Sequence, residues 1–253
     1  TKIDLHYNNL IGSIPNLNLP NLQQFDCSYN QLSGNIPDFN NLPNLQSFGC
    51  SDNNLSGTIP NFDSLPNLQS LGCSNDNLSG TIPNFDNLSN LQWFVCSENN
   101  LSGTIPNFDN LSNLQWFDCS ENNLSGTIPN FDNLPNLFSF NCWANNLSGT
   151  IPNFDNLPNL HYFYPVLNHF VFENILPSII TIQNLVAANL TPGGYIYWPQ
   201  DSIFSDTLII RAPGQSLSID LGIDANVSSN QYQWYHNDSP LPLIIGSNKL
   251  NFN

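Results

Sequence analysis

The chain has 253 residues, of which 40% are hydrophobic and only 9% are charged, so it has enough apolar residues to bury a core. Three Lys and Arg stand against 19 Asp and Glu, for a formal net charge of −16. This scarcity of basic residues argues against binding nucleic acid or anionic lipid, both of which are recognised through Lys and Arg. No apolar run reaches the roughly 18 residues of a membrane span, so we expect no direct membrane insertion. The chain opens inside a patterned segment with neither Met nor a signal peptide, and we interpret it as a fragment of a longer protein.

A repeat of 23 residues dominates residues 1–165. Cysteine recurs at this spacing, and the surrounding positions repeat in step: Cys27, Cys50, Cys73, Cys96, Cys119 and Cys142. Within one unit, the pattern L-x-x-L-x-L-x-x-N-x-L is filled by Leu91, Phe94, Cys96, Asn99 and Leu101. A period of roughly 20 to 29 residues with this pattern is typical of leucine-rich repeats. We therefore predict a leucine-rich-repeat solenoid with a parallel β-sheet on its concave face and short turns or 3₁₀ segments on its convex face.

The spacing also predicts how the coils pack. Eight coils are expected, each with one short strand such as 93–97, and inward columns represented by Phe94, Ile105 and Phe108. No coil buries its apolar side chains alone, so each needs its neighbours.

An asparagine column follows the strands, because an amide can both donate to and accept from a turning backbone: Asn30, Asn53, Asn99, Asn122 and Asn145. Asp76 interrupts this column, and an ionised carboxylate cannot donate. We expect that coil to be locally weaker or to use Asn75 or Asn77 instead. A tolerated exchange is favoured over a functional role for Asp76.

Two further columns have alternative interpretations. The cysteines replace inward leucines, and their parallel Cβ vectors suit a disulfide torsion poorly, so we predict buried free thiols rather than three disulfides. An aspartate column either caps the following turns by accepting backbone N–H bonds or binds Ca²⁺: Asp63, Asp86, Asp109, Asp132 and Asp155. We favour caps, and therefore assign no cofactor and no metal.

The concave face changes in character along the chain. Its early coils are small and polar, whereas the later coils carry aromatic residues flanked by carboxylates: Trp93, Trp116, Trp143, Phe138, Tyr162, Tyr164, Glu98, Glu121 and Asp118. Exposed aromatic clusters usually mark interaction sites, so we predict that these residues bind a cell-surface glycan or protein. The alternative is that the rings only stabilise the sheet by cross-strand stacking, or are covered by the next domain.

After residue 165 the repeat ends. We predict a C-terminal cap and connector over residues 166–200, in which Phe170, Phe172, Ile175 and Leu176 close the core. From residue 201 to 253 the pattern is strand-like, and a tryptophan in QYQWYHNDSPL is typical of an Ig-like sandwich. About 50 residues are too few for the roughly 100 that such a domain needs, so this all-β domain is expected to be incomplete.

Two resemblances accompany these patterns. The LSGTIP stretches resemble the plant-type class of leucine-rich repeats, which includes plant receptor ectodomains. The order NHFVFENILPS, YWPQDSI, APGQSLSIDL and NQYQWYHNDSPL resembles large surface proteins of Bacteroidota, in which repeats lead into an Ig-like domain. That resemblance implies an extracellular location on the cell surface and export by type IX secretion.

No enzyme is predicted, because the four histidines are scattered and no G-x-S-x-G, H-E-x-x-H or phosphate-binding glycine loop is present. Asp118 with Glu121 as an acid–base pair is a much weaker interpretation than solvated surface charges. We expect an extracellular bacterial adhesion protein. The alternative is a structural segment of a self-assembling fibre or appendage, in which the chain forms a homo-oligomer through open sheet edges.

Overall fold

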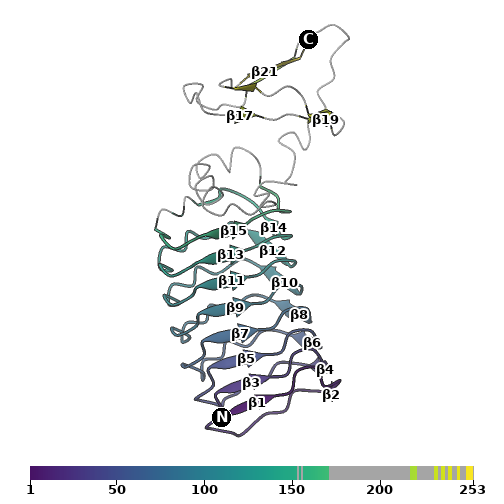
Figure 1. Cartoon of the computed structure of the whole chain (residues 1–253), viewed down its shortest axis with the longest axis vertical. Helices are drawn as coiled ribbons and strands as arrows, with labels where there is room; N and C mark the ends of the chain where they lie inside the picture. Colours follow the sequence, from purple (N-terminus) through teal and green to yellow (C-terminus); the bar gives the residue numbers. More distant parts are fainter. Residues whose placement is uncertain are drawn as a thin grey trace. The chain divides into compact units, whose positions relative to one another are not determined.

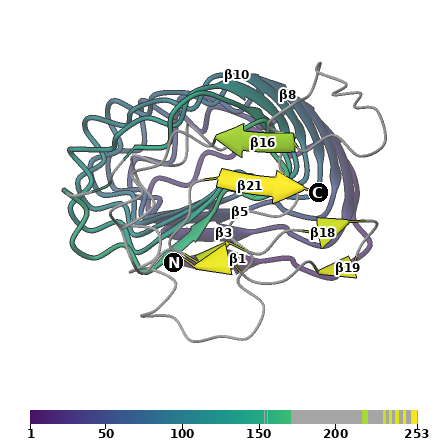
Figure 2. The same cartoon turned by 90° about the horizontal axis from the view of Figure 1, so that it is seen from above.

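The computed structural model describes residues 1–152, 154 and 156–170, together with short strands between residues 217 and 252. The chain divides into two compact units, Thr1–Ile203 and Phe204–Asn253. The described part of the first unit is a stack of coils, coloured from purple to green in Figure 1. Figure 2 looks along this stack, and successive coils lie over one another. Equivalent residues of neighbouring coils therefore form columns.

The first sheet takes one strand from each coil and is parallel throughout. Its strands, in spatial order, are β1 (Lys2–Asp4), β3 (Gln24–Asp26), β5 (Ser47–Gly49), β7 (Ser70–Gly72), β9 (Trp93–Val95), β11 (Trp116–Asp118), β13 (Ser139–Asn141) and β15 (Tyr162–Tyr164). The predicted parallel sheet is confirmed. Strand β9 is shorter than the predicted 93–97, because the Asn99 amide binds the carbonyls of Cys96 and Ser97 and turns the chain there.

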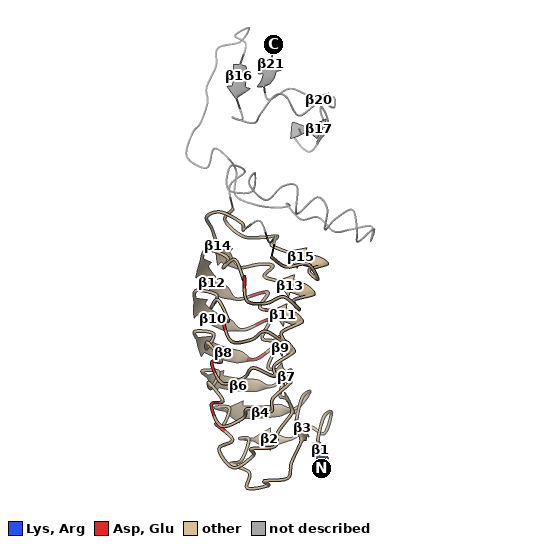
Figure 3. Ribbon diagram, turned by 90° about the vertical axis from the view of Figure 1, so that its left-hand side faces the viewer, with Lys and Arg blue, Asp and Glu red and all other residues tan. Residues whose placement is uncertain are grey.

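A second parallel sheet runs along the Asn-Leu-Ser-Gly segments. Its strands are β14 (Asn146–Leu147), β12 (Asn123–Gly126), β10 (Asn100–Gly103), β8 (Asn77–Gly80), β6 (Asn54–Gly57), β4 (Gln31–Gly34) and β2 (Ile11–Gly12). Figure 3 shows the two sheets on opposite sides of the coils. The prediction named turns or 3₁₀ segments on the convex face and did not include this second sheet. Turns do occur beyond it, as between Phe108 and Leu111, where the N–H of Leu111 donates to the Phe108 carbonyl at 2.9 Å.

Stacked phenylalanines fill the space between the sheets. The rings of Phe94 and Phe117 are parallel, with centroids 5.5 Å apart, and Phe85 meets Phe94 edge-on at 5.0 Å. Phe85 has a φ of 55°, a left-handed conformation that bulky residues avoid at a cost of about 1–2 kcal/mol. Its nearly complete burial offsets this cost. At the far end of the core Phe170 is fully buried, whereas Phe172 and the other predicted cap residues lie outside the described residues.

The six cysteines are free and buried, which confirms the predicted thiols. The Cys27 thiol donates to the Gly49 carbonyl of the next coil at 3.5 Å. Burial is the main reason that the pKa of Cys27 is raised to about 12. These thiols therefore stay protonated and fill space.

The asparagine column forms the predicted hydrogen bonds. The Asn122 Nδ2 donates to the carbonyls of Cys96 at 3.0 Å and Ser120 at 3.0 Å, and its Oδ1 accepts from the Leu101 N–H at 2.9 Å. Each amide thus links its own coil to the preceding one. The column therefore satisfies backbone groups that no strand pairs.

Asp76 keeps the place of an asparagine and remains buried. Its Oδ1 accepts from the Leu55 N–H at 2.8 Å, but its Oδ2 has no hydrogen-bond partner. The expected replacement by Asn75 or Asn77 does not occur: Asn75 binds the Asp52 carboxylate on the surface at 2.7 Å, and Asn77 is exposed in β8. Burial raises the pKa of Asp76 to about 7, since removing an ionised carboxylate from water costs more free energy than removing a protonated carboxyl group.

The aspartate column is held by side-chain amides. Asp63 accepts from Asn61 at 2.6 Å and from Asn87 of the next coil at 3.1 Å. Asp109 accepts in the same way from Asn107 at 2.8 Å and from Asn133 at 2.9 Å. The predicted backbone caps are therefore wrong for these two carboxylates, and neutral amide donors between successive coils reduce the repulsion along the column.

In the second unit, three antiparallel pairs are described. They join β16 (Leu217–Asp220) to β21 (Lys249–Phe252), β17 (Gln231–Tyr232) to β20 (Ile244–Ile245) and β18 (Tyr235–His236) to β19 (Ser239–Pro240). The Ig-like arrangement and the boundaries at residues 166–200 and 201–253 fall mostly outside the described residues and stay predictions. Within the described part of the chain, no helix has the length and apolar character needed to cross a membrane.

Candidate ligand-binding face

The outer face of the first sheet has two halves that differ in side chains but share one backbone pattern. We call β1, β3, β5 and β7 the plain half, and β9, β11, β13 and β15 the aromatic half. Outward positions alternate with buried ones along each strand, so Trp93 projects beside the buried Phe94. In the parallel register Ser70 pairs with Trp93, and the two halves meet there.

Five aromatic rings of the aromatic half form a continuous series of contacts, which we call the aromatic row: Trp93, Trp116, Phe138, Tyr162 and Tyr164. The two indoles stack at 5.1 Å with planes 7° apart. Phe138 follows Trp116 at 6.5 Å and meets Tyr162 edge-on at 5.3 Å. Tyr162 stacks on Tyr164 at 6.3 Å. The structure thus brings together five of the six aromatic residues predicted for the site.

The aromatic row remains open to solvent although its members touch. Trp93 is 44% exposed, and Phe138 and Tyr164 are each 37% exposed. Trp116 is flanked by rings on both sides, whereas one face of Trp93 is turned toward Ser70 and has no aromatic neighbour among the described residues. The row therefore presents ring edges along its length and one open indole face at its beginning.

Trp143 does not join the aromatic row. It lies two residues beyond β13, is half-buried, and makes no ring contact with the other five among the described residues. Its backbone N–H donates to the Asn141 Oδ1 at 3.1 Å.

The three predicted carboxylates occupy two different settings. Asp118 is half-buried and fully hydrogen-bonded, since it accepts from Ser120 Oγ at 2.7 Å and from Asn141 Nδ2 at 3.0 Å. Glu98 and Glu121 are exposed at equivalent turns, with φ of 53° and 51°. The pKa of Glu121 is raised, first by partial desolvation and then by the nearby charges of Glu98 and Asp118. Glu98 and Glu121 thus form an acidic rim beside the aromatic half. Asp118 instead links the ends of β11 and β13 through its hydrogen bond with Asn141.

Sequence reasoning missed two aromatic contacts. His161 stacks on Phe138 at 4.8 Å and adds a second ring contact between Phe138 and the coil of Tyr162. The signal was present, because His161 follows Phe138 by one repeat in a column otherwise filled with glutamine. In the plain half, Tyr7 and Tyr29 stack at 4.2 Å at the turn position that Glu98 occupies in the other half.

Family models match this region of the chain. The model described as Leucine Rich repeats (2 copies) matches residues 43–87, and the model described as Leucine Rich Repeat matches residues 21–42 and 113–134. The coils are leucine-rich repeats. Leucine-rich repeats are protein-interaction modules, and neither matching family is a catalytic one. No curated protein matches the chain.

Solved leucine-rich-repeat structures are similar to the chain. A TDR receptor is 34% identical with a TM-score of 0.64, over 67% of this chain and 31% of that one. The plant peptide hormone receptor RGFR1, in complex with RGF2, is 34% identical with a TM-score of 0.61, over 63% of this chain and 27% of that one. InlP of Listeria monocytogenes is 34% identical with a TM-score of 0.52, over 62% of this chain and 45% of that one. The chain spans about a third of the length of the two receptors.

Proposed function

We propose that the chain binds an extended segment of a partner protein along the aromatic row, as an adhesion protein on a bacterial cell surface. The observation that carries this proposal is the exposure of the aromatic row in one half of a sheet whose interior is apolar in both halves. Large exposed rings are costly to keep in water unless another surface covers them. Leucine-rich-repeat neighbours described as a receptor and as a receptor–peptide complex support protein binding.

The orientation of the rings favours a protein over a glycan. Stacking along the coils covers both faces of Trp116, whereas sugar recognition by aromatic rings uses a broad free face. The ring edges instead suit apolar side chains that alternate along an extended peptide, with the indole N–H groups available as donors. The open face of Trp93 is the natural place for a larger anchor side chain.

The charge around the aromatic row favours a basic partner. Glu98 and Glu121 form the acidic rim, and Lys2 is the single Lys or Arg in residues 1–170. Nothing basic on the aromatic half therefore competes with a cation brought by the partner. The partner segment is accordingly expected to combine apolar residues with Lys or Arg.

Two resemblances support the assignment to a bacterial surface. The junction motifs resemble surface proteins of Bacteroidota, and a leucine-rich-repeat protein of Listeria monocytogenes is among the structural neighbours. Extracellular leucine-rich repeats and an acidic, apolar surface are compatible with adhesion.

The test is a selection of display-library peptides on the immobilised 253-residue chain, followed by affinity measurements on variants. Trp93→Ala with Trp116→Ala is expected to weaken binding of the selected peptides by about a thousandfold, since aromatic anchors contribute about 2 kcal/mol or more each. The matched control is Gln24→Ala with Ser47→Ala, which changes the same column in the plain half, away from Trp93, and should leave affinity unchanged.

Three outcomes would contradict the proposal. Equal affinity of the tryptophan variant and the wild type would remove the aromatic row from the site. Saturable binding on a glycan array without any peptide selected would replace the protein partner by a sugar. The third outcome is that no peptide is selected and light scattering shows self-association of both the wild type and the double tryptophan variant. This result would favour the alternative of a structural segment of a self-assembling fibre.

A further inference from the structure

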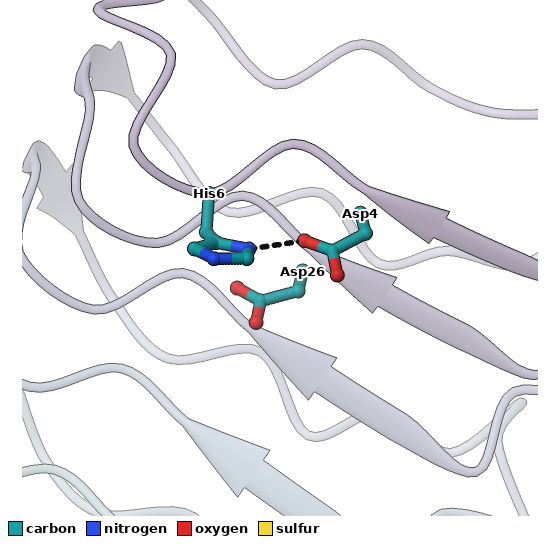
Figure 4. Close-up of side chains that lie close together, drawn as sticks. All are labelled: Asp4, His6 and Asp26. Carbon is teal, nitrogen blue, oxygen red and sulfur yellow. Dashed lines mark hydrogen bonds and ion pairs between the residues drawn. The ribbon is translucent and has the colours of Figure 1, made fainter.

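A histidine and two aspartates converge at the beginning of the first sheet, in the plain half and away from the aromatic row. Asp4 ends β1 and Asp26 ends β3, and the two residues are direct partners in the parallel register. His6 follows Asp4 by two residues, a spacing that places two side chains on one face of an extended chain. One ligand atom from each side chain lies within 4.8 Å of the other two. Figure 4 shows the three side chains close together at the ends of the two strands.

The charges of this cluster are only partly balanced by the protein. Carboxylates directly opposite each other on adjacent strands repel. Lys2 reaches the Oδ2 of Asp4 at 2.9 Å, and His6 contacts the Oδ1 of the same residue. Asp26 accepts only the backbone N–H of Ser28, at 3.0 Å, among the described hydrogen bonds. The carboxylate of Asp26 therefore faces the cluster without a cation of its own.

The same column of the aromatic half provides a matched comparison. There Asp118 stands beside Asn141 on the next strand, and the neutral amide donates to the carboxylate at 3.0 Å. The residue equivalent to His6 in that coil is Ser120, which also donates to Asp118. An aspartate at this position can therefore be stabilised by side-chain donors without a metal ion, as Asp118 is. The equivalent donors, an amide and a hydroxyl, are missing beside Asp4, where the neighbouring residues are a carboxylate and a histidine.

The donor set selects a class of ligand. Imidazole nitrogen together with carboxylate oxygens suits Zn²⁺ and related transition metals, whereas Ca²⁺ and Mg²⁺ prefer oxygen alone. Bonds of about 2.0–2.2 Å to a tetrahedral ion place ligand atoms about 3.3 Å apart, which small side-chain rotations would reach from the observed spacing. We propose that Asp4, His6 and Asp26 bind one Zn²⁺ ion or a similar divalent transition metal on the outer face of the first sheet.

Neighbouring groups hold the ligands in place. The Tyr7 ring meets His6 edge-on at 5.4 Å and stacks on Tyr29 at 4.2 Å, which restricts the imidazole. The Ser28 N–H fixes the carboxylate of Asp26. Three protein ligands leave one position of a tetrahedral ion open to water or to a group from another molecule. Because Asp4 and His6 are exposed, that position is reachable from solvent.

Zinc titration of the complete chain tests this site. Isothermal titration calorimetry with Zn²⁺ is expected to show one equivalent that His6→Ala and Asp26→Asn each weaken by at least about tenfold. The matched control Asp118→Asn, which makes the same exchange in the same column, should bind Zn²⁺ as the wild type does. Lys2→Ala should tighten binding, because it removes a positive charge next to the ion.

Spectroscopy separates this site from the buried cysteines. Co²⁺ bound by nitrogen and oxygen lacks the intense sulfur-to-metal charge-transfer absorption of a thiolate site. We therefore expect the Co²⁺-loaded chain to show no such absorption band. Absence of saturable Zn²⁺ binding would overturn the site, and so would equal affinity in the wild type, His6→Ala and Asp26→Asn. Circular dichroism of the variants confirms folding, and none of these substitutions alters the aromatic row, so this result is independent of the proposed function.

Discussion

The plain half and the aromatic half of the first sheet have apolar interiors of the same pattern and different outer faces. Phe48 and Phe117 occupy one buried column in the two halves, and each has at most 1% of its surface exposed. On the outer face the corresponding neighbours change from Ser47 to Trp116. Stacking requires the interior to repeat, because each coil buries its apolar residues only against the next. The outer face has no such requirement, so under the proposed function its variation marks the half that binds the partner.

The largest effect that this comparison predicts is on the common interior. Phe48→Ala and Phe117→Ala should each lower the free energy of unfolding by about 3–5 kcal/mol, since both rings are buried among other rings. Urea unfolding followed by circular dichroism measures both. A cost confined to the aromatic half would contradict the view that the two halves share one core.

The next effect is confined to the plain half and depends on pH. The pKa of Asp76 is about 7 in the folded chain, above the ordinary value of 3.8, mainly because the carboxyl group is buried. A raised pKa means that folding takes up a proton, so stability is greatest below pH 4 and is lost as the pH rises toward 7. The loss is on the order of a few kcal/mol, because a difference of one in pKa corresponds to about 1.4 kcal/mol.

The substitution Asp76→Asn should abolish this pH dependence, because an amide does not ionise, and its Nδ2 also provides the donor that Oδ2 lacks. Thermal unfolding from pH 4 to pH 8 should show a falling midpoint for the wild type and a much flatter one for the variant. Asn122→Asp is the matched exchange in the aromatic half and should introduce the same slope there. A wild type and an Asp76→Asn variant with parallel pH profiles would show that Asp76 is not the group responsible.

A smaller effect distinguishes two glycines at the same position of the second sheet. Gly57 and Gly103 both have a φ of 80°, so Ala at either site costs about 1–2 kcal/mol in backbone strain. A Cβ at Gly103 would also meet the Thr81 methyl at 2.9 Å, whereas at Gly57 it would meet the end of the flexible Asn35 side chain at 2.5 Å.

We therefore expect Gly103→Ala to lower the melting temperature more than Gly57→Ala does. Thr81→Ser, added to Gly103→Ala, should recover part of the difference because it removes the threonine methyl. Thermal unfolding of the three variants measures this. Equal melting temperatures for Gly57→Ala and Gly103→Ala would mean that the threonine methyl yields as easily as the asparagine side chain.

The first sheet and its core could be predicted from spacing alone. A period of 23 residues places Phe94, Cys96 and Asn99 at the same point of every coil, so each position needs to be interpreted only once. The second sheet could not be predicted, because its short strands carry little β-branched sequence and exist only through pairing with the next coil. Ser102, for example, pairs with Asn123, a contact that depends on how tightly the coils stack.

The candidate site was predictable in composition but not in geometry. The columns identify Trp93 and Trp116 as outward residues, and their stacking follows from the repeat. The same columns also suggested Trp143, which follows β13 by two residues and makes no contact with the rings of the aromatic row among the described residues. The proximity of His6 to Asp26 could not be predicted from the columns, because the two residues occupy different positions of the repeat in two different coils.

The most direct test of the central claim is fluorine NMR of the chain labelled with 5-fluorotryptophan, titrated with a selected peptide. Five tryptophans give five resonances, which single Trp→Phe variants assign. If the aromatic half is the ligand site, the resonances of Trp93 and Trp116 shift together and saturate at the affinity of the peptide. Saturable binding that leaves both resonances in place would contradict the account.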